Sequence, residues 1–199
     1  VHEGFTNFSE TLYTTYMFGT DAGNDYNYGT RKKIQNDIPI IGTYGVNKEG
    51  SSDMYYKGGN LLNTIRHIID NDEKFRQILR GLNKTFYHQT VTTKQVEQYI
   101  SKQAGIDFSK VFDQYLRTVQ IPQLQYYFSD DDKKLFYRWD NCINGFNMPI
   151  VLHSGAVKKV LYPDLQWKSL PVNESEAALF SSSYIDKNYY ITLIKKENP

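Results

Sequence analysis

The sequence contains a single cysteine, Cys142, so an internal disulfide and a cysteine-based metal site are both excluded. Its four histidines are His2, His67, His88 and His153, and no two of them are four positions apart, as the paired histidines of a metal-binding helix are. No apolar run approaches the roughly 20 residues that a membrane span requires. These absences exclude disulfide crosslinks and a membrane-spanning helix within this sequence.

The chain also lacks an excess of charge of either sign. Its 23 lysines and arginines balance 22 acidic residues, for a net charge of +1, and the basic residues are scattered. We therefore expect no nucleic-acid partner, because such binding needs clustered basic residues. At 199 residues the chain can form two small domains or one of ordinary size. The compartment is left open, with a periplasmic or exported protein favoured; any signal peptide would lie upstream.

Two acidic residues in the first ten positions are candidates for a metal site. Glu3 precedes Gly4-Phe5, and Glu10 follows seven positions after Glu3, so on a helix both project from one face. A carboxylate in the first helical turn is favoured in its ionised, metal-binding form by the helix dipole. Ligating histidines usually donate their other N–H to a nearby carboxylate, a role that suits the second acid. The alternative is that Glu3 only stabilises the helix start.

A second segment, Tyr55-Tyr56-Lys57-Gly58-Gly59, places a tyrosine where a hydrogen-bond donor is useful. The tyrosine hydroxyl is neutral at working pH and can donate to a developing oxyanion. Because the chain has 17 tyrosines, a packing or surface role is the competing interpretation for any one of them.

The two segments, in this order, resemble the M1 family of zinc metallo-aminopeptidases, a gluzincin family. In that family HExxH supplies two histidine ligands, a later E-G-F segment supplies the third ligand, and the first tyrosine of Y-x-K-G-A binds the oxyanion. The resemblance implies that Glu3 is the metal ligand, Glu10 the supporting acid and Tyr55 the catalytic tyrosine. Gly59 replaces the usual alanine, and the sequence has no HExxH.

The middle of the chain predicts a series of helices. Apolar stripes run from Leu61 to Ile69 and from Phe75 to Phe86. Thr92-x-x-Gln95 is a capping box that opens a helix ending near Gly105, and Asp107 caps another. A short helix between loops is expected between Gly19 and Gly50. This run resembles the end of the M1 catalytic domain, with Tyr115 and Gln120 in place of the family's tryptophan and glycine.

After Pro122 the period changes to the alternation of strands. Strands are predicted near residues 124–128, 135–139, 148–152, 157–162 and 189–194, with turns between them. Their short spacing predicts a small β-sandwich, and it resembles the immunoglobulin-like domain that follows the catalytic domain in many M1 enzymes. Asp130-Asp131-Asp132 lacks calcium-loop spacing, so we interpret it as a solvated hairpin turn.

The fold class that follows is α+β. Residues 1–120 are expected to form the helical C-terminal part of a thermolysin-like catalytic domain, and residues 121–199 the sandwich. The implied reaction of the parent enzyme is removal of the N-terminal residue from peptide substrates with zinc as cofactor. The chain itself is expected to be inactive and to hold no zinc, because the HExxH ligands are absent.

Three alternatives remain open. A related gluzincin family of glycyl aminopeptidases has similar E-G-F-T and Y-x-K-G segments, but a PDZ-like domain follows them. A non-catalytic relative could use the fold as a scaffold. A β-sandwich binding module, for instance for carbohydrate, would expose aromatic residues on one sheet face; the candidates are Tyr126, Tyr137, Trp139 and Trp167.

If the chain is a fragment, its helices should leave an apolar surface uncovered. The helix from Glu3 is the most affected, and the side chains expected on or near that surface are Phe5, Phe8, Leu12 and Tyr16. We expect self-association through this surface, and a wider separation of Glu3 and Tyr55 than in an intact site.

Overall fold

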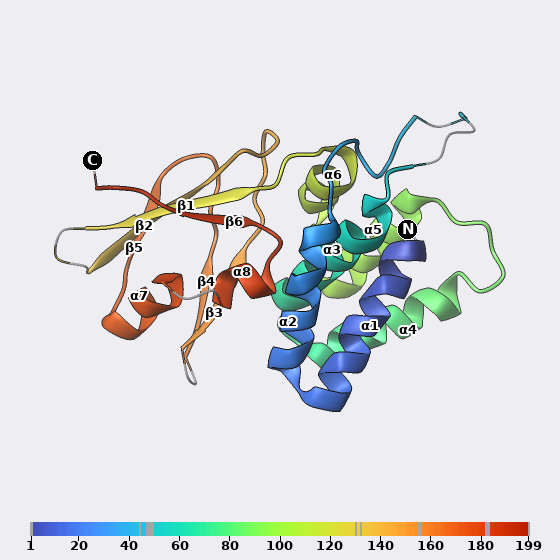
Figure 1. Cartoon of the computed structure of the whole chain (residues 1–199), viewed down its shortest axis with the longest axis horizontal. Coiled ribbons are helices and arrows are strands. Elements are labelled where there is room, and N and C mark those ends of the chain that lie inside the picture. The colour runs from blue at the N-terminus through green and yellow to red at the C-terminus, as the bar shows by residue number, and fades with distance from the viewer. Residues whose placement is uncertain are drawn as a thin grey trace.

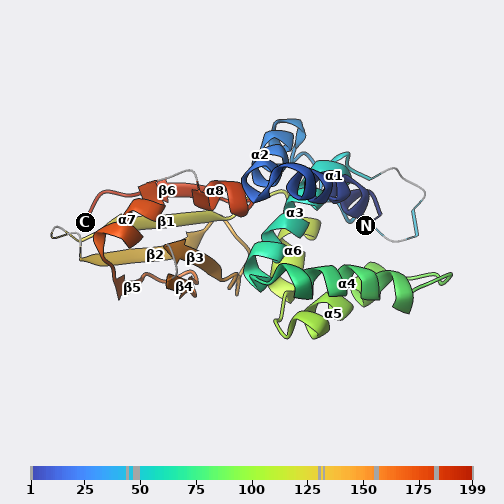
Figure 2. The same ribbon diagram turned by 90° about the horizontal axis from the view of Figure 1, so that it is seen from below.

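The computed structural model describes residues 2–43, 45–46, 50–129, 131, 133–154, 157–181 and 184–198. Figures 1 and 2 show an elongated molecule, with one group of helices at one end and the strands at the other. The first part of the chain is helical, as its apolar stripes predict. Its elements are α1 (His2–Phe18), α2 (Thr20–Thr30), the 3₁₀ turn η1 (Arg31–Lys33), α3 (Asp53–Ile69), α4 (Asp72–Thr85), α5 (Thr93–Ala104) and α6 (Ser109–Arg117).

The ends of the helices are stabilised by hydrogen bonds between residues a few positions apart, which is why the local sequence predicts them. At the start of α5 the Gln95 amide donates to Thr92 Oγ1 at 3.3 Å, and the Thr92 amide donates to Gln95 Oε1 at 2.8 Å. Gly105 then ends the helix with a φ of 70°, a conformation that glycine adopts without strain. Asp107 accepts from the Ser109 amide at 2.8 Å at the start of α6. The capping box is confirmed, whereas the N-cap of α6 is Phe108 and Asp107 lies one position before it.

The second part of the chain combines strands with two short helices. The strands β1 (Gln123–Phe128), β2 (Lys134–Asp140), β5 (Lys168–Pro171) and β6 (Thr192–Lys195) form one sheet in the order β5-β2-β1-β6. A separate hairpin pairs β3 (Ile150–Ser154) with β4 (Val157–Leu161). The helices are α7 (Glu174–Ser181) and α8 (Tyr184–Asn188).

The strands differ from those of a purely antiparallel sandwich. The pairing of β1 with β6 is parallel, because α7 and α8 carry the chain back before the last strand. Sequence periodicity missed both helices, and the predicted last strand starts at Thr192 instead of Tyr189. The α+β class is observed, and no described helix is long and apolar enough to cross a membrane.

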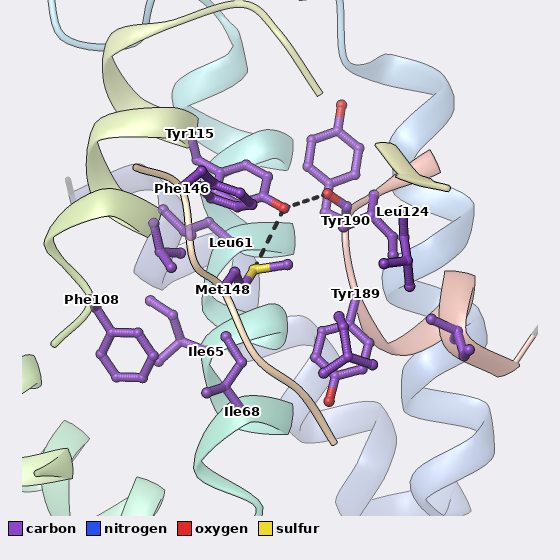
Figure 3. Close-up of a cluster of buried hydrophobic side chains, with 14 of the residues drawn as sticks. Leu61, Ile65, Ile68, Phe108, Tyr115, Leu124, Phe146, Met148, Tyr189 and Tyr190 are labelled. Atoms are coloured by element: carbon purple, nitrogen blue, oxygen red, sulfur yellow. Dashed lines mark hydrogen bonds between the residues drawn. The ribbon is translucent and has the colours of Figure 1, made fainter. Parts of the chain in front are cut away.

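One hydrophobic core joins the helices to the strands (Figure 3). Tyr115 of α6 is fully buried, and its hydroxyl donates to the Tyr190 carbonyl at 2.6 Å. On the other side of the junction, the Tyr189 hydroxyl donates to the Val151 carbonyl at 3.0 Å. Aromatic side chains from α6 and from the segment before β6 therefore share one interior. The boundary at residue 120 stays a prediction.

Replacing Tyr115 with Phe should lower the free energy of unfolding by about 1–2 kcal/mol. The change removes one buried hydroxyl and leaves the Tyr190 carbonyl without that donor. Urea denaturation measures the effect, with Tyr87→Phe as the control because Tyr87 is 71% exposed. Equal stability of the two variants would contradict a stabilising role for the bond.

A half-buried histidine near the same junction should make stability depend on pH. Burial lowers the pKa of His67 to about 4, and its Nε2 lies 3.1 Å from Asn24 Oδ1. Because the unfolded pKa is about 6.5, the unfolded chain binds more protons below that pH. Stability is therefore complete above pH 6.5 and falls as the pH drops towards 4.

The expected loss through His67 is about 2 kcal/mol between pH 6.5 and pH 5. Urea denaturation across this range should show a smaller loss for His67→Gln, whose side chain does not titrate. Parallel pH profiles for the two proteins would show that His67 does not cause the effect.

Candidate functional site

The two segments singled out in the sequence meet where α1 crosses α3. A Cβ atom added to Gly58 would lie 2.9 Å from the Gly4 Cα atom, and one added to Gly4 would lie 3.1 Å from Gly58 backbone atoms. Both distances are shorter than ordinary carbon contacts, so a side chain at Gly58 would force the helices to shift, and one at Gly4 would fit only if the backbone of α3 gave way slightly. The glycines of the E-G-F and Y-x-K-G segments therefore have a packing role.

The crossing carries the two candidate site residues on the first turns of their helices. Glu3 is half-buried in the first turn of α1, and Tyr55 lies in the first turn of α3 with 41% of its surface exposed. Tyr55 precedes Gly58 by three positions, so both lie on neighbouring parts of the same helix face. The tyrosine that follows, Tyr56, is half-buried, and its ring centroid lies 6.5 Å from that of Tyr55.

Glu10 lies on the same side of α1 as Glu3, two turns further on. Its carboxylate accepts a short hydrogen bond from the Tyr26 hydroxyl and a 3.4 Å bond from Asn7 Nδ2. The bond to Glu10 raises the pKa of Tyr26 to about 12, with burial as a further cause. Glu10 is exposed and has a hydrogen-bonding role, although its described partners are Tyr26 of α2 and Asn7, and not a metal-ligating histidine.

Lys33 and Tyr56 extend this polar surface. Lys33 Nζ donates to the Tyr56 hydroxyl at 3.0 Å and lies 4.6 Å from the centre of its ring. That bond raises the pKa of Lys33. The hydroxyl of Tyr56 therefore accepts a hydrogen bond from a cation, whereas Tyr55 lies next to it at the surface.

The lysine of the same segment points the other way, into the protein. Lys57 is 0% exposed and donates to the Thr118 carbonyl at 2.9 Å, which ties α3 to the end of α6. Burial lowers the pKa of Lys57, and the charge of Asp53 opposes that shift. Asp53 in turn accepts from the Gln35 and Asn36 amides at 2.8 and 2.7 Å. Tyr55 is thus the member of the segment that faces solvent.

Comparison with known proteins places this arrangement in a known fold. No protein-family model matches the chain, and no curated sequence is detectably similar to it. The chain superimposes on the crystal structure of Legionella pneumophila aminopeptidase A in complex with aspartic acid with a TM-score of 0.63 and 17% identity. The similar structure is an aminopeptidase. The match covers 98% of this chain and 24% of the Legionella chain, so the chain spans about a quarter of that protein.

Within the described parts of the chain, the acidic and histidine side chains do not form a metal site by themselves. Among the described residues, no three His, Cys, Asp or Glu side chains cluster closely enough to hold a metal ion. A catalytic zinc ion takes three protein ligands. Among the described residues Glu3 is a single candidate carboxylate, so these residues do not supply a complete zinc site. Of the acidic turn, Asp131 accepts from Ser129 Oγ at 2.7 Å, and Asp130 and Asp132 lie outside the described residues.

The apolar surface expected on α1 is present in part. Tyr16 is 87% exposed, and Tyr13, Met17 and Phe18 are exposed as well. Phe8 was wrongly assigned to this surface. It is 1% exposed, because its ring packs against Phe75 of α4 with centroids 5.8 Å apart. The two remaining candidates, Phe5 and Leu12, are half-buried against the core.

The aromatic residues expected for a carbohydrate-binding sheet face are mostly interior. Tyr126, Tyr137 and Trp139 are buried, which contradicts their place on an exposed face. Trp167 is 39% exposed and packs against Tyr127, with centroids 5.0 Å apart. A flat aromatic platform built from the four is therefore not observed.

Proposed function

We propose that this chain is part of a metallo-aminopeptidase of the M1 type, with zinc as the metal and peptides as substrates. The observation that carries the proposal is the helix crossing at Gly4 and Gly58. It brings together the two segments that resemble the family's metal-ligand and oxyanion segments, in a fold similar to that of an aminopeptidase. A fold is shared by proteins of many functions, so the argument depends on the site residues.

Tyr55 is the residue to which we assign a chemical step. When water attacks a peptide carbonyl, negative charge develops on its oxygen, and a hydroxyl already held in place stabilises that charge. A surface position on a rigid helix turn suits this role, because the donor must reach a substrate in a cleft. The crossing glycines and buried Lys57 hold the turn that carries it.

Glu3 is proposed as one carboxylate ligand of the metal and Glu10 as a nearby hydrogen-bonding acid. The remaining ligands and the general base would come from residues outside this chain. The thermolysin-like and immunoglobulin-like assignments of the two parts belong to the same proposal. The sheet and helices of the C-terminal part then support the site from the side of α8, which contacts α2.

The proposed function is tested with a longer protein that includes an upstream HExxH segment. Release of p-nitroaniline from an aminoacyl p-nitroanilide should require bound metal. Glu3→Ala should lose both metal and activity, whereas Glu73→Ala, at an exposed surface ion pair, should lose neither. Metal-independent cleavage, or full metal content in Glu3→Ala, would count against the assignment.

The chain of 199 residues by itself should not retain stoichiometric zinc. A lone carboxylate cannot supply the three protein ligands of a catalytic site. Metal analysis after dialysis against a mild chelator measures this directly. Tight binding of one zinc per chain would reveal a different site, and His2→Ala would test the histidine next to Glu3 first.

A further inference from the structure

A buried hydrogen-bond network links the start of α3 to the C-terminal part of the chain. Its centre is Asn60, which is 0% exposed. The Asn60 Oδ1 atom accepts from Asn27 Nδ2 at 2.9 Å and from Arg31 Nε at 2.7 Å. Its Nδ2 group donates to Thr30 Oγ1 at 3.0 Å and to the carbonyl of Tyr56 at 2.9 Å. Asn60 therefore uses both ends of its amide: Oδ1 accepts from α2 and η1, and Nδ2 donates to α2 and to the tyrosine turn.

Arg31 continues the network into the C-terminal part. Its Nη1 donates to the Asp186 carbonyl at 2.6 Å, and its Nη2 donates to the Tyr189 carbonyl at 3.0 Å. The guanidinium carbon also lies 5.2 Å from the centre of the Tyr190 ring. Figure 1 shows α2 next to α8. The planar guanidinium thus holds three acceptors from two distant parts of the chain in one geometry.

The chemistry of the three Arg31 acceptors indicates the role of the network. They are amide and peptide oxygens, and burial lowers the pKa of Arg31. A buried cation is costly to desolvate, and an ion pair is the usual compensation. The charge of Asp186 offsets part of this cost, and the cation strengthens the hydrogen bonds that fix the position of Asn60. Three successive hydrogen bonds, through Arg31 and Asn60, then connect the Asp186–Tyr189 corner to the Tyr56 carbonyl, one residue after Tyr55.

We propose that Arg31 and Asn60 are positioning residues for Tyr55, and that the α8–β6 corner is thereby part of the support of the active site. The crossing at Gly58 fixes the first turns of α3 from the side of α1, and Asn60 fixes them from the side of α2. This proposal rests on the proposed function, because Tyr55 needs a fixed position only if it takes part in catalysis. Displacement of a catalytic group by about 1 Å lowers turnover by roughly 100-fold.

Two variants separate positioning from plain stability. Asn60→Asp keeps two acceptor oxygens for Arg31 and Asn27 but loses the donor to the Tyr56 carbonyl. Arg31→Lys keeps the positive charge but has a single donor nitrogen in place of the three, Nε, Nη1 and Nη2, that meet the three acceptors in a fixed fork. In the longer enzyme both should lower kcat by roughly 10- to 100-fold with KM changed less than about 2-fold. Arg76→Gln, an exposed arginine paired with Glu73, is the matched control and should leave both constants unchanged.

A second measurement uses this chain alone and does not depend on activity. Amide hydrogen exchange over residues 53–60 should become roughly 10-fold faster in both variants, while exchange in α5 stays unchanged. Unchanged exchange and unchanged kcat in a folded Asn60→Asp protein would overturn the positioning role alone. A wild-type longer protein without aminopeptidase activity would overturn the proposed function, and the positioning proposal with it.

Discussion

Replacing Tyr55 with Phe in the longer enzyme should lower kcat by roughly 10²–10³-fold, the usual loss for one oxyanion donor. This change removes only the hydroxyl group. Because Tyr55 is 41% exposed, the loss of that group should disturb little of the protein interior. Metal content and KM should stay near their wild-type values, because the interaction is made mainly in the transition state. Steady-state kinetics with a peptide substrate and metal analysis measure these three quantities.

The neighbouring tyrosine provides the decisive comparison. The Tyr56 hydroxyl already accepts from Lys33 at 3.0 Å, so Tyr56→Phe should cost much less turnover than Tyr55→Phe. If Tyr56→Phe produced the larger loss, the catalytic role would belong to Tyr56. Near-normal turnover in both variants would remove this turn of α3 from the mechanism.

Features that depend on neighbours along the chain could be predicted from the sequence. The cap at Thr92 and the end at Gly105 involve bonds between residues a few positions apart, and both are observed. The apolar stripe in α3 has the period of a helix whatever it packs against. The placement of Glu3 in the first turn of a helix followed in the same way from local patterns.

Features that depend on distant partners could not be predicted. Asn60 and Arg31 have no local signal, because their partners lie in α2, α3 and the segment before β6. Phe8 belongs to an apolar stripe, but only the position of α4 shows that it is covered. The helix α7 carries acidic residues at its start and little apolar periodicity, so it escaped the period-based prediction.

The glycines of the two site segments lead to the largest expected effect on stability. Helix interiors normally disfavour glycine by roughly 1 kcal/mol relative to alanine. The chain retains glycine at positions 4 and 58 because the backbones of α1 and α3 approach too closely for a side chain. The nearest atoms are backbone atoms, which cannot rotate away as a side-chain tip can.

Replacing Gly58 with Val should therefore lower the free energy of unfolding by about 3 kcal/mol, the upper part of the usual range for overpacking. Its Cβ would meet the Gly4 Cα atom at 2.9 Å, so α1 must move away from α3. Gly29→Val in α2 is the matched control, since a Cβ there meets nothing within 4 Å, and it should change stability by less than about 0.5 kcal/mol. Urea denaturation of both variants measures the difference. Equal stabilities would show that α1 can shift at little cost, and the crossing could then not hold Glu3 and Tyr55 in a fixed relation.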